Sequence, residues 1–450
     1  MKQTRKIDIA LPPSFSETGP NRRYPVVIVF DGEAHLPTIA AVSEELVRNG
    51  AIPEMIYVAI ENTDPFAGRV YDLTPPGLSV SGSDLNQGGD KFLDFIEQEL
   101  LPAVDRQLRG APPRLVIGHS SGGILATWAA ATRPAFRGVI DIEGPVAFQD
   151  FWLVKKLTAR ATSASTAPLR YMVFEAGAGE RQFPWPDKVW QEFASAAPPS
   201  WKLHRERLRF EGHETSYMLS AYIGLRDIFS DYSRLAAVTT PASERLAYYA
   251  RVSESFGAPL VPPRSLLEDA IDALLSEGRG AVARQVYNAL ASGYGSSSDT
   301  VTLLARIAKV EASPQPTETV ESLLKTPFPA PDEAREFIGE WVGDLWMNPN
   351  QPRRNNLHFR VRIDNGRVIA ETMNVAAPAE RAGWAAVDYL RVTPRGLTWG
   401  RLNGMTPRGV MLWEGTLAGG TLSGKGRWGG IVFENPPSID PGFSFSRVIR

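Results

Sequence analysis

The sequence predicts an α/β protein with a doubly wound sheet, followed by a short helical region and a C-terminal antiparallel β-barrel-like domain. Three observations predict this order. Apolar runs alternate with helix-compatible segments up to about residue 234, as in parallel sheets whose strands are buried on both faces. Helical periodicity then dominates to about residue 327. Short strand-like segments separated by turn residues fill the remainder of the chain.

The amino-terminal region, 1–234, is expected to contain the sheet. The stretch 91–108 carries apolar residues at helical spacing and is expected to be one of its covering helices. Active sites in such sheets lie beyond the carboxyl ends of the strands. The residues Asp31-Gly32-Glu33, Ser120 and the loop after Phe174 should therefore share one crevice. The expected strands are 7–11, 26–30, 55–60, 115–117, 138–142 and 171–174.

The second region, 235–327, is predicted to be a helical bridge between domains. Ser265-Leu266-Leu267-Glu268 has the pattern of a capping box at the start of one helix, and Gly278 is expected to end that helix. No 34-residue period is visible, so a repeat array is not expected. The proline-containing segment 312–317 is expected to be a linker or loop.

The third region, 328–450, is predicted to be an antiparallel barrel or sandwich. Strand-like alternation is broken by turn signals such as Asp364-Asn365-Gly366 and Gly419-Gly420. Its tryptophans either line a ligand pocket or, as is more common in small barrels, close the core. These are Trp341, Trp346, Trp384, Trp399, Trp413 and Trp428.

Composition excludes several classes of function. The 48 basic and 50 acidic residues nearly cancel, so neither nucleic acid nor a membrane is expected as a partner. The absence of cysteine excludes disulfides, thiolate metal ligands and a cysteine nucleophile. No apolar run approaches the roughly 18 residues of a membrane span. The N-terminus lacks the apolar segment of a signal peptide, so a cytoplasmic protein is expected; a secreted or periplasmic chain without its leader would look the same.

The strongest functional signal is Gly118-His119-Ser120-Ser121-Gly122-Gly123, which lies between the apolar run 115–117 and a helix-like segment. A Gly-x-Ser-x-Gly sequence between a strand and a helix is typical of a nucleophile elbow. The tight turn strains the central residue and requires small neighbours. Ser120 is therefore the candidate nucleophile, and the backbone amide of Ser121 is a candidate oxyanion donor. The alternative is a glycine-rich turn with a solvent-exposed serine.

A serine nucleophile needs a base, and the 5 histidines allow elimination. His35 precedes the elbow and is expected to line the cleft or cap a helix. His119 directly precedes the nucleophile, with its side chain expected to point away. His204 lies in a half-exposed strand pattern and His358 in the C-terminal region. His213 remains, on a loop after the last strand of the sheet, which fits the chain order serine, acid, histidine. The alternative is a surface loop histidine.

The acid that orients this histidine is expected on the loop after the strand 171–174. Glu175 is so close to the strand end that it can turn under the sheet. Glu180 follows Gly177-Ala178-Gly179, a flexible stretch that can bring a carboxylate to an imidazole. Glu180 is therefore the first candidate and Asp187 the second. An ordinary solvated loop charge is the alternative.

The region from about Lys6 to Asp231 resembles the putative-esterase family of α/β-hydrolases, which includes enterobactin-type siderophore esterases, feruloyl esterases and S-formylglutathione hydrolases. The resemblance implies Ser120 as nucleophile and His213 as base, and the family spacing after a glycine matches Glu180. It also implies an oxyanion hole formed by the backbone amides of Ser121 and Glu33. The matching segments are 24–33, 61–64, 72–75, 88–96, 118–123 and 212–213.

Other parts of the chain carry weaker resemblances and two departures. The helical region resembles the short tetratricopeptide-like tail of some members, and Gly339-Glu340-Trp341 resembles the opening of lipocalin-like barrels. Many members read Asn-Thr-Asp-Arg-Thr-Arg-Asp-Leu-Thr-Pro where this chain has the longer segment 62–75. They usually carry Ser-Pro where this chain has Glu143-Gly144-Pro145. Both loops are expected to border the acyl or alcohol pocket, so the departures concern the substrate more than the mechanism.

The sequence therefore predicts a serine carboxylic ester hydrolase that acts through an acyl-enzyme. Such chemistry requires neither a metal nor an organic cofactor. The expected partner is a small-molecule ester, of siderophore or aryl type by resemblance. One alternative is an acyltransferase that uses the same triad. The other is a non-catalytic binding or scaffold protein with a degenerate hydrolase domain, against which the intact Ser120 and His213 argue.

Overall fold

The computed structural model describes residues 3–448 except 65, 80–86, 164–166, 181, 238, 296–297, 313–319, 347–353, 375–382, 394–395, 403–409 and 430–440. The chain divides into two compact units. The first consists of Met1–Glu268 and Asn288–Ser297, and the second of Asp269–Tyr287 and Ser298–Arg450. The boundary between the two units therefore falls inside the helical region.

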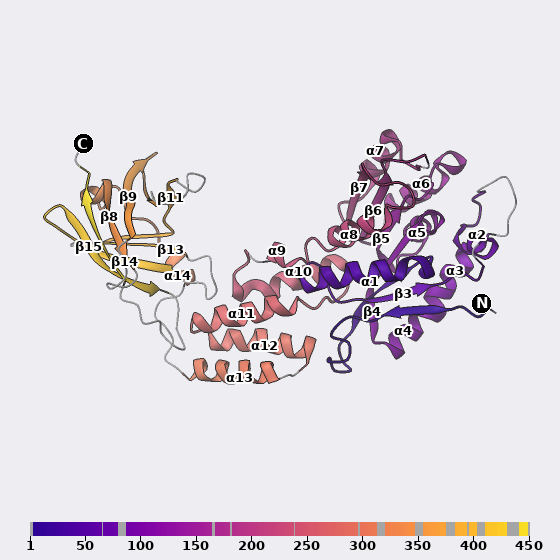
Figure 1. Ribbon diagram of the computed structural model, residues 1–450, viewed down its shortest axis with the longest axis horizontal. Helices are drawn as coiled ribbons and strands as arrows, with labels where there is room; N and C mark the ends of the chain where they lie inside the picture. Colours follow the sequence, from indigo (N-terminus) through magenta and orange to yellow (C-terminus); the bar gives the residue numbers. More distant parts are fainter. Residues whose placement is uncertain are drawn as a thin grey trace. The chain divides into compact units, whose positions relative to one another are not determined.

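A seven-stranded sheet forms the centre of the first unit (Figure 1). Its order is β1-β3-β2-β4-β5-β6-β7, with β1 antiparallel to β3 and every other neighbouring pair parallel. The predicted doubly wound α/β fold is therefore confirmed. The strands are β1 (Ile7–Ala10), β2 (Tyr24–Val29), β3 (Ile56–Ile60), β4 (Gly110–His119), β5 (Phe136–Ile142), β6 (Leu169–Ala176) and β7 (Trp201–Leu208).

Helices cover both faces of this sheet because the strand side chains alternate between two apolar cores. In β2, Val26 and Ile28 belong to one core, and Val27 and Val29 to the other. The helical segments of the first core are α2 (Ala67–Leu73), α3 (Gly89–Phe95), a π-helical segment (Ile96–Leu100), α4 (Leu101–Gln107), α5 (Ser121–Thr132), α6 (Phe148–Ala161) and α7 (Asp187–Ala196). Those of the second core are α1 (Gly32–Arg48), α8 (Tyr217–Ile228), α9 (Arg234–Ala237), α10 (Arg245–Phe256) and the first turn of α11 (Arg264–Ser276).

The carboxyl ends of the parallel strands meet at one edge of the sheet. Asp31 follows β2 after one residue, Ser120 follows β4 directly, and Glu143 follows β5 directly. Because the strands are parallel and neighbouring, these three residues are brought to the same edge. This edge is where the sequence places the active site.

The helical region continues after α10. Its main helices are α11 (Arg264–Ser276), α12 (Gly280–Tyr294), α13 (Ser298–Glu311) and α14 (Val320–Leu324). Gly278 has a φ of 71° and follows α11, as predicted. The predicted capping box is wrong, because α11 begins at Arg264 and Ser265 lies inside the helix. The expected linker 312–317 lies almost entirely outside the described residues. Among the described residues, no helix is long and apolar enough to cross a membrane.

The second unit contains an antiparallel sheet in which paired strands are consecutive in the sequence, except that the last strand, β16, pairs with the first, β8. The two ends of the strand order, β11 and β12, belong to one stretch of chain: Val387 N donates to Ala370 O at 3.0 Å, and Asp388 N donates to Gly400 O at 2.9 Å. This stretch joins β10 to β13, and β16 pairs with β8, so the sheet curls as in an up-and-down barrel. The strands are β8 (Gly339–Trp346), β9 (Arg354–Asp364), β10 (Arg367–Asn374), β11 (Ala385–Ala386), β12 (Tyr389–Thr393), β13 (Gly396–Leu402), β14 (Val410–Ala418), β15 (Thr421–Gly429) and β16 (Gly442–Arg447).

Aromatic side chains fill the interior of this sheet. Trp341, Trp399 and Trp413 are buried in one core with Phe359 and Phe445. These three tryptophans therefore close the core. Two of the other expected pocket residues, Trp346 and Trp384, are half-buried, and the side chain of Trp428 lies outside the described residues.

The hairpin turns follow the sequence signals. Asn365 and Gly366 have φ values of 48° and 76°, and Gly419 and Gly420 have 56° and 79°. Two consecutive left-handed residues are the requirement of a type I′ turn, which Asn-Gly and Gly-Gly meet most readily.

Candidate active site

Ser120 occupies a strained turn between β4 and α5. Its φ is 59° and its ψ is −119°, a conformation that residues other than glycine rarely adopt. The amide of Ser120 donates to the carbonyl of Ile142 at the end of β5, at 2.8 Å. The residue is 7% exposed. The turn therefore holds the serine at the carboxyl edge of the sheet, as the elbow pattern predicts.

The glycines around Ser120 are required by close approach of the backbone. A Cβ at Gly118 would lie 2.1 Å from the carbonyl oxygen of Gly122, which no side chain can tolerate. A Cβ at Gly123 would lie 2.3 Å from Oδ1 of Asp141. The spacing of the motif thus reflects the packing of α5 against β4 and against the residues that follow β5.

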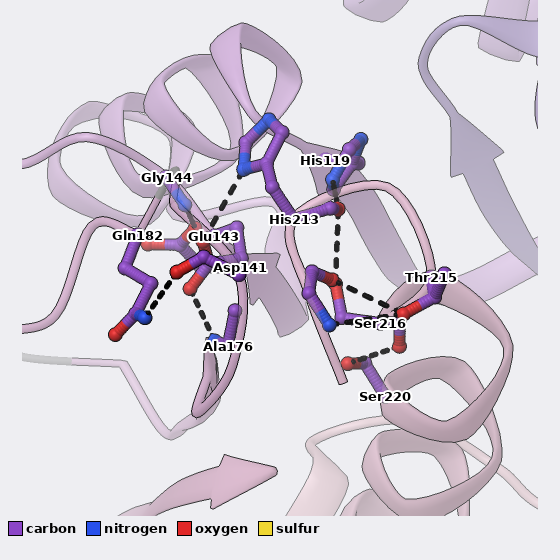
Figure 2. Close-up of polar contacts among 12 residues, drawn as sticks. His119, Asp141, Glu143, Gly144, Ala176, Gln182, His213, Thr215, Ser216 and Ser220 are labelled. Atoms are coloured by element: carbon purple, nitrogen blue, oxygen red, sulfur yellow. Dashed lines mark hydrogen bonds and ion pairs between the residues drawn. The ribbon is translucent and has the colours of Figure 1, made fainter. Parts of the chain in front are cut away.

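His213 pairs with a carboxylate that the sequence did not single out as the acid. Its Nδ1 lies 3.2 Å from Oε2 of Glu143, as Figure 2 shows. Both residues are buried, with exposed fractions of 4% and 1%. The other oxygen of Glu143, Oε1, accepts a hydrogen bond from the backbone amide of Ala176. The carboxylate is therefore oriented by β6 while it contacts the imidazole.

Glu143 reaches this position through an unusual backbone turn. Its φ is 54°, and its amide donates to the carbonyl of Phe174 at 2.8 Å. Asp141, two residues earlier, accepts the amide of Gly144 at 3.0 Å and the hydroxyl of Thr127 at 2.8 Å. Asp141 is fully buried, and burial raises the pKa of its carboxyl to about 7. Hydrogen bonds with β6, through Phe174, and with α5, through Thr127, therefore fix this turn.

The two expected acids, Glu180 and Asp187, and the third carboxylate considered, Glu175, lie elsewhere. Glu180 is exposed, and the structure places Glu143 rather than Glu180 beside His213. Glu175 is buried at the end of β6 and accepts two hydrogen bonds from Arg205, at 2.9 and 3.1 Å. The exposed carboxylate of Asp187 accepts another from Arg205, at 2.8 Å. Glu175 and Asp187 thus both form ion pairs with Arg205.

A usable signal for Glu143 was present in the sequence. It directly follows β5, the neighbour of the nucleophile strand, and it replaces the Ser-Pro that many relatives of the resembled family carry there. The expectation treated Glu143-Gly144-Pro145 as a pocket border. The contact with His213 instead places this residue beside the candidate base.

The positions of the other four histidines agree only in part with those expected from the sequence. The ring of His119 lies 4.6 Å from that of His213 and 5.6 Å from that of His35, measured between centroids. Burial, reinforced by neighbouring His119, lowers the pKa of His35 to about 4. His204 pairs with Asp227 on the second core face, and His358 pairs with Glu340 in the barrel. His119, expected to point away, is thus part of the histidine cluster.

Two helix N-termini meet near Ser120. Helix α5 begins at Ser121, and α1 begins at Gly32, directly after Asp31 with its left-handed φ of 53°. The first amides that donate within these helices belong to Gly123 and Ala34. The amides of Ser121 and of Glu33 precede them and so belong to the orphan donors of a helix start. Donors of this kind can stabilise an oxyanion.

Arg69 links these two helix starts. Its Nε and Nη2 donate to the two carboxylate oxygens of Asp31 at 2.6 and 2.9 Å, and its Nη1 donates to Oγ of Ser121 at 3.3 Å. Asn62 donates to Asp31 at 2.8 Å and to the carboxylate of Glu33 at 2.8 Å. The loop that departs from the family pattern therefore supports the predicted oxyanion region.

The first part of the chain is similar to one protein family and to several solved structures. Residues 1–216 match the family model described as Putative esterase. The IroE-like serine hydrolase from Shewanella oneidensis is 25% identical, with a TM-score of 0.54 over 64% of this chain and 95% of that chain. An uncharacterised protein from Capnocytophaga ochracea shares the fold at 16% identity, with a TM-score of 0.50 over 69% of this chain and 87% of that chain. The siderophore hydrolase EstA from Aspergillus nidulans is 17% identical, with a TM-score of 0.43 over 50% of this chain and 90% of that chain.

No curated relative matches the chain. The family match confirms the resemblance to the putative-esterase family over residues 1–216. It supports an ester hydrolase.

Proposed function

We propose, from the membership of residues 1–216 in the putative-esterase family, that the chain is a serine carboxylic ester hydrolase. Ser120 is the nucleophile, His213 the general base and Glu143 the acid that orients it, in place of the expected Glu180. The observation that carries this proposal is the buried contact between His213 and Glu143 beside the strained turn of Ser120.

The contact supports Nε2 as the ring nitrogen of His213 that exchanges the proton with Ser120. Nδ1 of His213 faces Glu143, so Nε2 is left for the hydroxyl of Ser120. A buried carboxylate at Nδ1 selects this tautomer and stabilises the imidazolium that forms during the reaction. The ring of Phe183 lies edge-on to His213 with centroids 5.2 Å apart, which limits the approach of water to the imidazole.

The reaction proceeds in two steps. The oxygen of Ser120 attacks the ester carbonyl while His213 Nε2 takes its proton, and the amides of Ser121 and Glu33 stabilise the oxyanion. Collapse of the tetrahedral intermediate releases the alcohol, which receives the proton from His213, and leaves an acyl-serine. Water then attacks the acyl group with His213 again as base, and Ser120 regains its proton as the acid product leaves.

The substrate class follows from the resemblance of the sequence, which favours siderophore-type or aryl esters. The Shewanella oneidensis neighbour, described as an IroE-like serine hydrolase, supports the serine mechanism by its similarity. An acyltransferase with the same residues differs only in the final acceptor, so product analysis with and without added alcohol distinguishes the two.

The test is turnover of a panel of short acyl, aryl and catecholate esters by the full chain and by Ser120→Ala. We expect hydrolysis by the wild type and a loss of about 10³-fold or more in the variant. Activity of Ser120→Ala within tenfold of wild type would contradict the assignment. A wild-type chain inactive on every ester, with no adduct after treatment with a fluorophosphonate, would favour a scaffold with a degenerate site.

A further inference from the structure

His119 makes a contact that the proposed reaction does not use. It is the last residue of β4, adjacent to Ser120, and its side chain is buried with 8% of the residue exposed. Its Nε2 lies 2.7 Å from the backbone carbonyl oxygen of His213, as Figure 2 shows. A carbonyl oxygen can only accept, so Nε2 of His119 carries the hydrogen. The contact joins residues 94 positions apart in the sequence.

The loop that carries His213 is held mainly by contacts within itself. The amides of Thr215 and Ser216 donate to the carbonyl of Gly212, both at 3.1 Å, and the hydroxyl of Ser216 donates to the carbonyl of His213 at 3.3 Å. These bonds shape the turn that leads into α8. Because they span only a few residues, they cannot set the distance between the turn and the nucleophile strand.

Apart from the side-chain contact of His213 with Glu143, hydrogen bonds at two places fix the main chain of the loop to the sheet. On the β6 side, the amides of Gly177 and Ala178 donate to the carbonyl of Glu211, at 3.1 and 3.0 Å. On the β4 side, the anchor is the hydrogen bond from His119 to His213. The second contact attaches the base directly to the residue beside the nucleophile. A shift of about 1 Å in such a pair can cost on the order of 10²-fold in rate.

The ring of His119 packs against two other aromatic rings. His35 and Tyr217 stack on each other with centroids 3.8 Å apart, and His119 lies edge-on to both, at 5.6 and 6.3 Å. Burial lowers the pKa of His119, and the charge of nearby His213 acts in the same direction, whereas the hydrogen bond to the carbonyl of His213 and the charges of Glu214 and Asp31 raise this pKa. A neutral ring at this place avoids repulsion with the imidazolium that forms on His213, 4.6 Å away.

We propose that His119 is a positioning residue: its Nε2–H holds the main chain of His213 at the distance from which the imidazole reaches Ser120. This inference rests on the proposed function. Glu143 orients the ring of His213 through the side chain, and His119 positions the same residue through the backbone. The two contacts act on different atoms, so their loss has separable effects.

The discriminating experiment compares three substitutions in the full chain. The amide nitrogen of Gln reaches the place of the imidazole Nε2, whereas that of Asn, one methylene shorter, does not. His119→Gln should keep kcat within about fivefold of wild type. His119→Asn and His119→Leu should lower kcat by about 10- to 100-fold with KM nearly unchanged, and should slow fluorophosphonate labelling of Ser120 by a similar factor. His204→Leu, remote from the cluster, is the matched control and should leave kcat within twofold.

The outcomes separate the inference from the proposed function. If Gln, Asn and Leu lower kcat equally, the loss comes from packing and the positioning role is wrong. It is also wrong if all three keep kcat within twofold while Ser120→Ala is inactive. If Ser120→Ala retains activity, the proposed function itself fails, whatever His119 does. Should His119→Leu not fold, as judged by its thermal unfolding, the comparison of Gln with Asn decides alone.

Discussion

Oε2 of Glu143 lies 3.2 Å from Nδ1 of His213, although 70 positions separate the two residues in the chain. The carboxylate comes from the end of β5, next to the nucleophile strand, and the imidazole comes from the loop after β7. The pair therefore spans the carboxyl edge of the sheet on which Ser120 stands. A buried imidazole–carboxylate contact at this place is the arrangement that the proposed general-base catalysis requires.

Exchange of the carboxylate beside His213 should impair the reaction specifically. Glu143→Gln keeps the shape of the side chain but removes the charge that stabilises the imidazolium. We expect kcat to fall by about 10²- to 10⁴-fold, as for the loss of an orienting acid in other triads. Glu180→Gln, which changes an exposed carboxylate, is the matched control and should stay within twofold of wild type in the same steady-state assay. A crippled Glu180→Gln with a nearly normal Glu143→Gln would restore the acid expected from the sequence.

The close packing at the elbow should make Gly118 intolerant of any side chain. A Cβ there would lie 2.1 Å from the carbonyl oxygen of Gly122, so the turn must distort. Gly118→Ala should lower the free energy of unfolding by about 1–3 kcal/mol and abolish fluorophosphonate labelling. Gly19 provides the comparison, because a Cβ added there would have no atom within 4 Å, and Gly19→Ala should change neither quantity measurably. Equal behaviour of the two variants in urea unfolding would contradict this explanation of the motif.

The buried imidazole of His35 should make stability depend on pH. Burial lowers its pKa in the folded protein to about 4, from the ordinary value of 6.5. Between these values the unfolded chain binds the proton more readily, so this contribution to stability is present above about pH 6.5 and is lost as the pH falls towards 4. His35→Phe keeps a ring to stack on Tyr217 but cannot titrate. Urea unfolding at pH 5 and pH 7.5 should show a smaller difference between the two pH values in His35→Phe than in wild type. An unchanged difference would assign the acid sensitivity to other groups.

The barrel should not take part in the chemistry. Ser120, His213 and Glu143 all belong to the first compact unit, within Met1–Glu268. A chain that ends at Lys325 retains every segment of that unit, so a folded truncation should hydrolyse small activated esters within about fivefold of wild type. Turnover of a bulky ester can fall further if the missing region contributes to its binding. The truncation is first shown to be folded by circular dichroism. If it then loses both small-ester turnover and labelling of Ser120 by the probe, the removed residues complete the site.

The sequence predicts the features that depend on local pattern. The elbow around Ser120 is readable because strand, tight turn and helix follow each other within a short segment, and each imposes its own residue types. His213 is the candidate base because it is the only histidine of the amino-terminal region, 1–234, that follows the last strand of the sheet. The barrel strands were found through alternation and through turns such as Asn365-Gly366, whose left-handed backbone restricts the residues allowed.

The carboxylate that contacts His213 was not among the acids expected from the sequence, for a physical reason. The departure from the family pattern at Glu143-Gly144-Pro145 marks this residue. Its approach to His213, however, depends on which strands are neighbours in the sheet and on the left-handed turn at Glu143, and no local pattern encodes either. Glu180 followed a flexible glycine stretch, and flexibility alone does not bring a side chain to its target. The hydrogen bond from His119 to the carbonyl of His213 could not be predicted from a local pattern either, since it joins two segments far apart in the chain.

The central claim is that Ser120 is activated by His213 and Glu143, and covalent labelling tests it most directly. The full-length wild type, Ser120→Ala, His213→Ala and Glu143→Gln are treated with a fluorophosphonate probe, and the adduct is located by mass spectrometry. The account predicts rapid labelling of wild type on the peptide that contains Ser120, no adduct in Ser120→Ala, and labelling slowed by at least about 10²-fold in the other two variants. Labelling at another serine, or equal rates in wild type and His213→Ala, would contradict it.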